Sequence, residues 1–445
     1  MANPREIALK ILLDVENDSA FSNLELNHTL VQEQLSGRDT AFVSALVYGV
    51  LERKLTLDEI IRQYSKIPLR KIETTTKVIL RMGILQLLFM DKVPESAAVN
   101  ESVNLAKRSK LQRSAGFING ILRSITRAEE KYRLPDKSKD KIAYYSILYS
   151  APQELVRLWI NAYGEENAVQ LLEQLSGRPP LCVRVNTLRN TKQELEQILD
   201  KEGVKYEEIP FLPDALHLYN TGSLLKLQSF NERRFYVQDA SSQLCVQALD
   251  PKPGELMLDV CAAPGGKSFT AAMLMENKGK ILAFDNYDQK VRLMQESSWG
   301  LFIDIIRVET RDAGDGEPLP TADRILCDVP CSGLGVLSRK PEIRYKDDLL
   351  HNDLPEIQYR ILCHSAQYLA PGGRLVYSTC TLNPRENNEQ TARFLREHPD
   401  FSGVKLTLPE GVGRAVEEED YEITLMPHTA HTDGFYFAVF TRRSP

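Results

Sequence analysis

The stretch from Leu256 to Ser268, LMLDVCAAPGGKS, decides the fold of the second half of the chain. A short apolar run reaches an acid at Asp259, and a loop of small residues then leads into an amphipathic segment. This order is typical of a strand, a loop and a helix whose N-terminus binds a nucleotide. Because the loop carries no bulky side chain, its backbone N–H groups can approach a ligand closely. The stretch therefore predicts a ligand-binding turn between a strand and a helix.

This loop matches neither of the two commonest nucleotide motifs. A P-loop that ends at Gly266-Lys267-Ser268 needs glycine at position 261, where the chain has Cys261. The dinucleotide pattern G-x-G-x-x-G is absent from the stretch as well. An ordinary tight turn is the alternative interpretation of the loop when it is considered by itself.

Beyond Arg234, strand-like runs alternate with helical runs. The strand-like runs are residues 256–260, 280–285, 305–312, 322–328 and 373–380. This spacing predicts an α/β domain with a mostly parallel sheet covered on both faces by helices. Residues 421–428 and 434–443, joined through Asp433-Gly434, predict a closing antiparallel pair of strands.

Acids or cysteines follow the predicted strands, at the edge of the sheet where ligands of such folds bind. They are Asp259, Asp285, Asp312, Asp328, Cys331 and Cys380. Asp285 is placed to accept hydrogen bonds from ribose hydroxyls, and Asp312 is placed to meet an adenine. A solvated loop acid is the simpler interpretation of any one of them. Three acids in register with a glycine-rich loop predict a nucleoside-containing ligand.

Cys331 and Cys380 follow two neighbouring predicted strands, so both should open into the same crevice. A zinc site needs about four clustered ligands, and neither Cys363 nor His364 supplies a recognisable ligand spacing. A disulfide is less favoured, because seven scattered cysteines suggest reduced thiols in a cytoplasmic protein. The remaining interpretation is a nucleophile with an assisting thiol.

A thiolate adds readily to an electron-poor ring carbon, and a nearby cation lowers the pKa of a thiol. Three cations stand near the two cysteines or the loop in the sequence: Lys267, Arg339 and Lys340. We expect at least one of them to favour the thiolate.

Residues 1–140 show helical spacing of apolar side chains without strand-like alternation, which predicts an all-helical domain. The run from Val78 to Phe89 is apolar almost all round, so we expect it to form a central buried helix. Residues 1–140 hold 22 Lys and Arg against 18 Asp and Glu, although the whole chain has a net charge of −6. The cluster Lys107-Arg108-Ser109-Lys110, with Arg113 nearby, can grip phosphates, and a solvated helical face is the alternative.

The pattern divides the chain into three parts. Residues 1–140 are the helical domain, residues 150–235 read as a small α+β unit that could serve as a substrate platform, and residues 236–445 are the sheet domain. The composition, 42% hydrophobic and 26% charged, is that of a soluble globular protein. The longest apolar run, Ile84 to Met90, is too short to cross a bilayer. We expect a cytoplasmic monomer without a signal peptide, a metal or a membrane partner.

Four separated motifs resemble those of the RNA cytosine-C5 methyltransferases and stand in the order of that family. They are DVCAAPGGKS, DVPCSGLG with RKPEIRY after it, YSTCTLNPRENNEQ and DGFYFAVFTRR. The resemblance covers about residues 150–445, and the N-terminal helices resemble the NusB-like RNA-binding domain. This pairing is similar to the bacterial family that methylates C5 of cytosine 967 in 16S rRNA. Two departures from the family pattern are Tyr345, where a tryptophan is usual, and Trp299-Gly300.

The resemblance implies a Rossmann-like class I methyltransferase domain, S-adenosylmethionine as cofactor and small-subunit rRNA, free or in an assembly intermediate, as partner. It implies that Cys380 is the nucleophile and that Cys331 helps to resolve the covalent adduct. The residues implied to hold the cofactor are Cys261, Ala262, Ala263, Pro264, Gly265, Gly266, Lys267, Asp285, Asp312 and Asp328.

Three alternatives remain open. A tRNA cytosine-C5 methyltransferase is opposed only by the N-terminal domain. A non-catalytic RNA-binding assembly factor is opposed by the two retained cysteines. A methyltransferase of exocyclic amines favours an Asn/Asp-Pro-Pro-aromatic motif, where this chain has Asp328-Val329-Pro330-Cys331.

Overall fold

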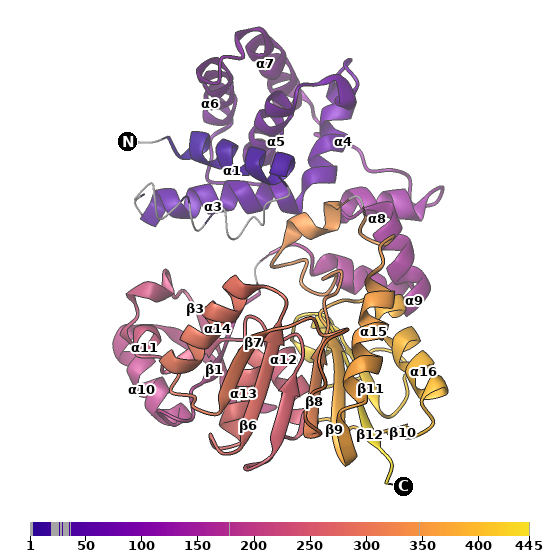
Figure 1. The fold of residues 1–445 in the computed structure, drawn as a ribbon. Coiled ribbons are helices and arrows are strands. Elements are labelled where there is room, and N and C mark those ends of the chain that lie inside the picture. The colour runs from indigo at the N-terminus through magenta and orange to yellow at the C-terminus, as the bar shows by residue number, and fades with distance from the viewer. Residues whose placement is uncertain are drawn as a thin grey trace. The chain divides into compact units, whose positions relative to one another are not determined.

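The computed structural model describes residues 3–18, 26, 29, 35, 37–177, 179–346 and 348–444. The chain forms two compact units (Figure 1). The first comprises Met1–Gly177 together with Leu337–Leu349, and the second comprises Arg178–Val336 together with Leu350–Pro445. Within the described ranges, no helix is long and apolar enough to cross a membrane. The three predicted ranges, 1–140, 150–235 and 236–445, remain predictions. They are defined by sequence pattern, whereas the two units are defined by contacts between residues.

The first unit is helical, which confirms the prediction for the described residues of 1–140. Its elements are α1 (Pro4–Asp18), α3 (Gly37–Glu52), α4 (Lys54–Tyr64), η1 (Leu69–Lys71), α5 (Thr74–Leu88), α6 (Glu95–Arg108), α7 (Gln112–Arg127), α8 (Lys141–Tyr149), α9 (Gln153–Glu173) and η3 (Pro341–Tyr345). Helix α5 is the central one, since it packs against α1, α3, α4, α6 and α7. Helix α9 is broken at Gly164, whose φ is 79°, so its two halves form a helical pair.

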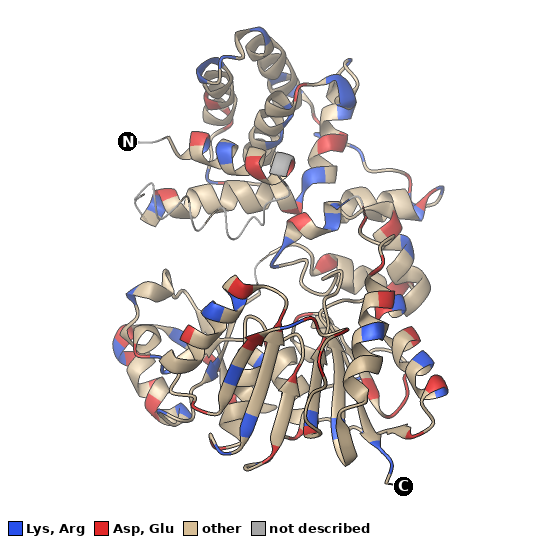
Figure 2. Cartoon of the chain, in the orientation of Figure 1, with Lys and Arg blue, Asp and Glu red and all other residues tan. Residues whose placement is uncertain are grey.

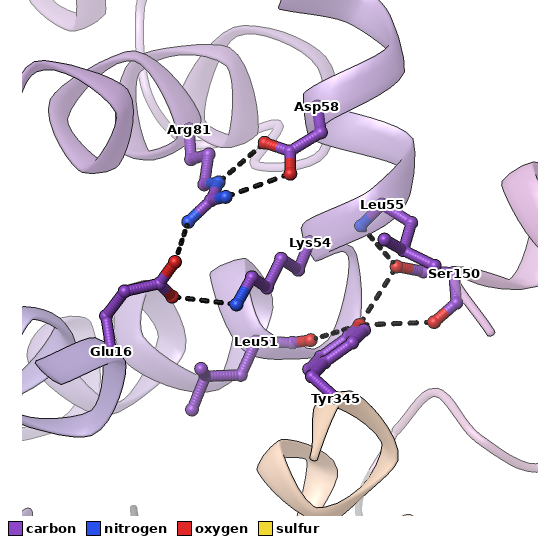
Figure 3. Close-up of polar contacts among 8 residues, drawn as sticks. All are labelled: Glu16, Leu51, Lys54, Leu55, Asp58, Arg81, Ser150 and Tyr345. Atoms are coloured by element: carbon purple, nitrogen blue, oxygen red, sulfur yellow. Dashed lines mark hydrogen bonds and ion pairs between the residues drawn. The ribbon is translucent and has the colours of Figure 1, made fainter. Parts of the chain in front are cut away.

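A buried ion-pair network joins three helices of the first unit (Figure 3). On α5, the Arg81 guanidinium donates to both carboxylate oxygens of Asp58 on α4, at 2.7 and 2.9 Å. It also reaches Glu16 on α1 at 3.4 Å, and Lys54 donates to the other oxygen of Glu16 at 2.8 Å. Because Arg81 and Asp58 are buried, each depends on the other for compensation of its charge, so the network fixes the helices that carry it.

The segment Leu337–Leu349 completes the helical unit although it stands far away in the sequence. Arg344 is fully buried and donates hydrogen bonds to the carbonyl oxygens of Glu52, Ser150, Leu175 and Leu337. Burial lowers the pKa of this guanidinium from its usual value. The segment Leu337–Leu349, which contains the motif RKPEIRY, therefore fills part of the core of the first unit and is called the plug below.

The next residue, Tyr345, holds the plug in place through hydrogen bonds of its hydroxyl group (Figure 3). Its hydroxyl lies 2.8 Å from the carbonyl oxygen of Leu51, and it lies 3.1 and 3.0 Å from the carbonyl oxygen and Oγ of Ser150. Ser150 Oγ in turn accepts a hydrogen bond from the backbone N–H of Leu55 at 2.8 Å. A tryptophan, which the family pattern favours here, has only a ring N–H and cannot also accept a hydrogen bond.

A small antiparallel sheet opens the second unit. Its strands lie in the order β2-β3-β1-β4. The elements are β1 (Leu181–Val185), α10 (Lys192–Glu202), β2 (Lys205–Ile209), β3 (Leu212–Tyr219), η2 (Leu224–Lys226), α11 (Gln228–Asn231) and β4 (Phe235–Val237). Helix α10 begins with a capping box in which Thr191 and Glu194 bond each other's backbone N–H groups. This order of strands and helices confirms that the region forms a small α+β unit, and β4 adds a fourth strand to its sheet.

The large sheet of the second unit has the strand order β10-β12-β9-β8-β5-β6-β7, with β11 paired to β12. Strands β5 to β9 are parallel, and β12 runs antiparallel to β9. This confirms the predicted mostly parallel sheet with antiparallel closing strands. The strands are β5 (Leu256–Asp259), β6 (Lys280–Asp285), β7 (Ile306–Thr310), β8 (Ala322–Asp328), β9 (Leu369–Thr379), β10 (Phe401–Gly403), β11 (Glu422–Leu425) and β12 (Phe435–Arg442).

Helices cover both faces of this sheet (Figure 1). Residues that alternate along β5 enter different cores: Met257 packs with α12, α13 and α14, whereas Leu258 packs with α15 and α16. The helices are α12 (Ala240–Leu249), α13 (Gly266–Leu274), α14 (Asp288–Gly300), α15 (Leu354–Ala366), η4 (Pro384–Glu386), α16 (Asn388–Glu397) and α17 (Pro427–Ala430). The strand expected over 421–428 ends at Leu425, because Pro427 begins α17.

Replacing Tyr345 with phenylalanine removes the hydroxyl that bonds Leu51 and Ser150. We expect the free energy of unfolding to fall by about 1–3 kcal/mol, since buried polar groups lose their partner. Urea unfolding of the full chain measures this. Tyr132→Phe is the matched control, because among the described residues its hydroxyl has no hydrogen-bond partner. Equal stability of the two variants would contradict an anchoring role for Tyr345.

Candidate functional site

The loop between β5 and α13 lies at the carboxyl edge of the large sheet, as expected. Gly265, the residue before α13, has a φ of +107°, and a Cβ there would stand 2.4 Å from the ring of Phe269. Glycine is therefore the residue that this turn accepts. The backbone N–H of Ala262 donates to the carbonyl oxygen of Phe284 at 2.7 Å, which ties the loop to β6. A cis peptide bond precedes Pro264.

Asp259 ends β5 as a buried carboxyl group, 1% exposed. Its Oδ2 accepts a hydrogen bond from Ser268 Oγ at 2.6 Å. Among the described residues, Oδ1 is buried without a hydrogen-bond partner. Burial raises the pKa of Asp259 to about 7, with a smaller rise from the nearby Asp328, and the Ser268 hydrogen bond opposes the rise. The carboxyl group therefore keeps its proton to a higher pH than a solvated aspartate does.

A lysine and an aspartate form the charged centre of the site. Lys267 Nζ donates to Asp328 Oδ2 at 2.6 Å, and Ser378 Oγ donates to Asp328 Oδ1 at 2.8 Å. The ammonium also lies 5.0 Å from the ring centroid of Phe435. Burial alone lowers the pKa of Lys267, but the Asp328 carboxylate outweighs it and the net pKa is raised. Lys267 therefore stays positively charged inside the site.

The two predicted cysteines meet in this centre, with 3.2 Å between Cys331 Sγ and Cys380 Sγ. The hydrogen bond with Cys380, followed by burial, raises the pKa of Cys331 well above its usual value. The Cys331 thiol therefore keeps its proton to a higher pH than a free thiol does. Lys267 interacts electrostatically with Cys380, so a negative charge on the Cys380 sulfur faces a fixed ammonium.

Glu386, to which the sequence assigned no role, holds the two cysteine loops together. Its side chain is 1% exposed and accepts hydrogen bonds from the backbone N–H and the hydroxyl of Ser332, at 2.9 and 2.5 Å. It also accepts from Gln358 Nε2 at 2.9 Å and from Asn383 Nδ2 at 2.8 Å. Ser332 follows Cys331, and Asn383 belongs to the loop after Cys380, so one carboxylate fixes both loops.

A close backbone approach adds a second link between these loops. Gly335 N–H donates to the carbonyl oxygen of Cys380 at 3.0 Å, and Gly434 N–H donates to the carbonyl oxygen of Gly335 at 2.9 Å. A Cβ at Gly335 would stand 1.8 Å from the carbonyl oxygen of Gly434. Only glycine permits this contact.

The two other acids predicted to bind the cofactor, Asp285 and Asp312, differ in their surroundings. Asp285, at the end of β6, accepts a hydrogen bond from Tyr287 N–H at 3.2 Å and pairs with Lys290 at 3.7 Å. It is close enough to Cys261 to contribute to the rise in the pKa of that thiol. Asp312 is exposed and accepts a hydrogen bond from Gly314 N–H at 2.7 Å. No described contact joins Asp312 to the rest of the group.

Of the three cations considered from the sequence, Lys267 is close enough to Cys380 to interact with it electrostatically. Arg339 and Lys340 belong to the plug Leu337–Leu349 of the first unit. Within the described ranges, no group of three or more His, Cys, Asp and Glu side chains is arranged to hold a metal ion.

In the first unit, the predicted basic cluster lies at the turn between α6 and α7. Lys107, Arg108, Lys110 and Arg113 are all exposed. Arg108 pairs with Glu6 at 3.0 Å and with Glu101 at 3.3 Å. Figure 2 shows the blue segments of this turn at one end of the helical unit. The exposed side chains of Lys107, Lys110 and Arg113 are available to bind a polyanion.

Three family models match the chain. Residues 246–441 match the family described as 16S rRNA methyltransferase RsmB/F, residues 2–127 match the NusB family, and residues 151–224 match the RsmF/B-like ferredoxin-like domain.

Named relatives are similar to the chain over almost its whole length. The probable ribosomal RNA small subunit methyltransferase B of Bacillus subtilis is 37% identical over 448 residues, which covers 99% of this chain and 98% of the relative. The protein of the same name from Synechocystis is 36% identical over 447 residues and covers 98% and 99%. The crystal structure of PH0851 shares the fold, with a TM-score of 0.83, 23% identity and 99% of both chains covered.

The raised pKa of Asp259 predicts a pH-dependent stability. Its pKa is about 7 in the folded chain against an ordinary value of 3.8, so the folded state binds a proton that the unfolded state releases between these values. This contribution is fully present below about pH 4 and is lost as the pH rises through 7, by about 4 kcal/mol in total. In Asp259→Asn the contribution disappears. In urea unfolding, the stability of the wild-type protein should fall relative to that of Asp259→Asn as the pH rises from about 4 to 7. A constant difference between the two proteins across this range would contradict a raised pKa for Asp259.

Proposed function

The chain belongs to the RsmB/F family of 16S rRNA methyltransferases, and on this premise we propose that it methylates C5 of a cytosine in small-subunit rRNA through a covalent adduct at Cys380. The observation that carries the proposal is the thiol pair, 3.2 Å apart, beside the Lys267–Asp328 ion pair. We propose cytosine 967 of 16S rRNA as the target and the cytoplasm as the place of reaction.

We propose S-adenosylmethionine as the cofactor, and the donor set of the site supports it. The small-residue loop from Cys261 to Lys267 brings backbone N–H groups to the start of α13, where an anionic group is favoured. The Asp285 carboxylate suits ribose hydroxyls, and Asp312 and Asp328 complete the proposed set. Asp259 Oδ1, a buried acceptor without a partner among the described residues, stands where this loop begins. When bound, the cofactor supplies an electrophilic methyl group.

The reaction requires that the cytosine ring be made nucleophilic at C5, which is unreactive while the ring is aromatic. We propose that the Cys380 thiolate forms a bond to C6, so that the electron pair of the C5–C6 double bond becomes available at C5. The Lys267 ammonium stabilises the thiolate before the attack. Both oxygens of Asp328 accept hydrogen bonds within the protein, so its role is to hold Lys267 and orient the ring.

The cycle ends when the proton on C5 leaves and the bond between C6 and sulfur breaks. Cys331, with its raised pKa, carries a proton 3.2 Å from the sulfur that departs. We propose that it protonates Cys380 and that the resulting Cys331 thiolate accepts the C5 proton. Positioned acid–base help of this kind contributes about 10²–10⁴-fold.

The helical unit supplies RNA affinity in this proposal. Lys107, Lys110 and Arg113 offer exposed positive charge at the turn between α6 and α7. Contacts between such cations and phosphates release counterions, so the binding should weaken with salt. The target base leaves its stack at a cost of a few kcal/mol, which is smallest in a loop.

The two cysteine variants should separate the two roles. Cys380→Ala is expected to lose methyl transfer to small-subunit rRNA while it keeps affinity for S-adenosylmethionine, because the thiol acts only in covalent addition. Cys331→Ala is expected to accumulate a protein–RNA adduct that survives a denaturing gel. The measurements are methyl incorporation, calorimetric cofactor binding and the gel.

Cys363→Ala is the control, because this half-exposed thiol lies on α15 beside His398. It should leave methylation intact and form no adduct. An adduct that persists in a Cys331/Cys380 double variant, or full activity of Cys380→Ala, would refute the assignment. Activity towards tRNA but not rRNA would move the substrate to tRNA.

Charge reversal at Lys107 and Lys110 should reduce RNA affinity and its salt dependence. Each lost phosphate contact lowers the slope of log affinity against log salt by about one. A filter-binding titration with small-subunit rRNA at several salt concentrations measures the slope. Lys139→Glu, at an exposed lysine that pairs with Asp136, is the control for charge alone. If the double variant keeps the wild-type slope, the cluster is a solvated face.

A further inference from the structure

Half of the exposed large apolar side chains among the described residues lie along one stretch of the second unit. Of the eight exposed large hydrophobic residues among those described, four lie between positions 287 and 302: Tyr287, Leu293, Trp299 and Phe302, which are 63%, 63%, 66% and 54% exposed. Single exposed apolar residues are ordinary on a protein surface, whereas a group of them marks an interaction site. The group follows α14 and the turn after it.

The end of α14 is joined to the small sheet by a buried asparagine. Asn186, 0% exposed, donates hydrogen bonds from Nδ2 to the carbonyl oxygens of Arg233 and Leu301 at 2.9 and 3.1 Å. Figure 1 shows α14 beside this sheet. Three segments, which carry Arg189, Arg233 and the Trp299–Phe302 turn, therefore form one continuous surface.

Arginines stand against the aromatic residues of this surface. The Arg189 guanidinium lies 4.2 Å from the centroid of the Phe302 ring. Arg233 lies so close to Gly300 that a Cβ at that position would stand 3.3 Å from Arg233 Nε. Glycine at position 300 thus lets the guanidinium lie against the end of the helix. Trp299-Gly300, one of the departures from the family pattern, makes this arrangement.

Charged side chains of both signs lie near the aromatic rings of this surface, and Glu232 is close enough to Arg189 to interact with it electrostatically. Arg189 and Arg233 are exposed, and among the described residues neither guanidinium forms an ion pair. Arg292 stands seven residues before Trp299, which places it on the same helical face, and Glu296 is the acid on that face. Figure 2 shows both colours along α14.

Exposed aromatic rings with unpaired arginines suit unpaired nucleotides. Bases stack on aromatic rings and on guanidinium planes, and arginines bind the phosphates between them. We propose that Trp299, Phe302, Arg189 and Arg233 form a platform that binds single-stranded nucleotides of the RNA. A protein partner would also use Trp and Arg, but two exposed guanidinium groups that form no ion pair with the described residues favour a polyanion.

The platform binds RNA that flanks the target, not the target base itself. Helix α14 has 13 residues, so its C-terminal end lies about 20 Å from its start near Asp285. The inference rests on the proposed function for the identity of the RNA, and it adds a second contact that fixes how the strand leaves the catalytic site.

Tryptophan fluorescence tests the platform directly, because the chain has two tryptophans and Trp159 is 1% exposed. A short single-stranded RNA of mixed sequence should quench the emission of Trp299 in the full-length protein. The quenching should be absent in Trp299→Phe even at RNA concentrations that saturate binding, as measured by anisotropy of labelled RNA. A fully paired RNA duplex should quench much less.

Affinity provides the second readout. Trp299→Ala should weaken binding of the same RNA by about 5- to 150-fold, and Arg189→Gln with Arg233→Gln should lower the salt slope by about two. Leu225→Ala, at a 69% exposed residue, and Lys252→Gln are the matched controls and should bind normally. With rRNA as methyl acceptor, Trp299→Ala should raise KM and leave kcat unchanged.

The outcomes separate the platform from the proposed function. Unchanged Trp299 emission with saturating RNA, or wild-type affinity of Trp299→Ala, overturns the platform and leaves methylation untouched. Quenching by ribosomal proteins but not by RNA assigns the surface to a protein partner and overturns it as well. Quenching by RNA in an enzyme that methylates no rRNA supports the platform and refutes the proposed function alone.

Discussion

The candidate site depends on one buried carboxylate. Glu386 accepts hydrogen bonds from Ser332, Gln358 and Asn383, and four donors offset the cost of removing its charge from water. The Tyr377 hydroxyl donates to the carbonyl oxygen of Glu386 at 2.6 Å, which fixes the backbone of the same residue to β9. Together with the hydrogen bond from Gly335 N–H to the carbonyl oxygen of Cys380, this centre joins the loops after β8 and β9 and thereby fixes the distance between the two sulfur atoms.

Much of the fold could be predicted because local pattern and architecture agree. The alternation of apolar strands and helices from Leu256 onward specified a parallel sheet, and its strand ends correctly indicated where Asp328, Cys331 and Cys380 would meet. Strand β4 was missed because three residues give no measurable alternation. The end of β11 at Leu425 was missed because the apolar pattern continues, while Pro427 favours the start of a helix.

The contacts that sequence could not reveal are those between distant segments. Glu386 stands in a recognisable motif, but nothing in YSTCTLNPRENNEQ shows that its carboxylate reaches Ser332, 54 positions away. The segments that carry Arg233 and Leu301 are likewise joined by Asn186, whose side chain donates a hydrogen bond to the carbonyl oxygen of each. The role of each cysteine, the cofactor contacts and the boundaries of the three sequence ranges stay predictions, because they concern ligands or divisions that chain geometry alone does not identify.

The plug Leu337–Leu349 has a consequence for how the chain is made. The ribosome completes the helices up to Gly177 and must then add roughly 160 residues before Leu337 is synthesised. At about 5–20 residues per second, this interval lasts roughly 10–30 s. During it, the carbonyl oxygens of Leu51 and Ser150 lack the Tyr345 hydroxyl, and the buried space of Arg344 is unfilled. The first unit is therefore synthesised first but can be completed only after Leu337–Leu349 has been added. A nascent chain stalled before residue 337 should expose an incomplete helical core to chaperones and proteases.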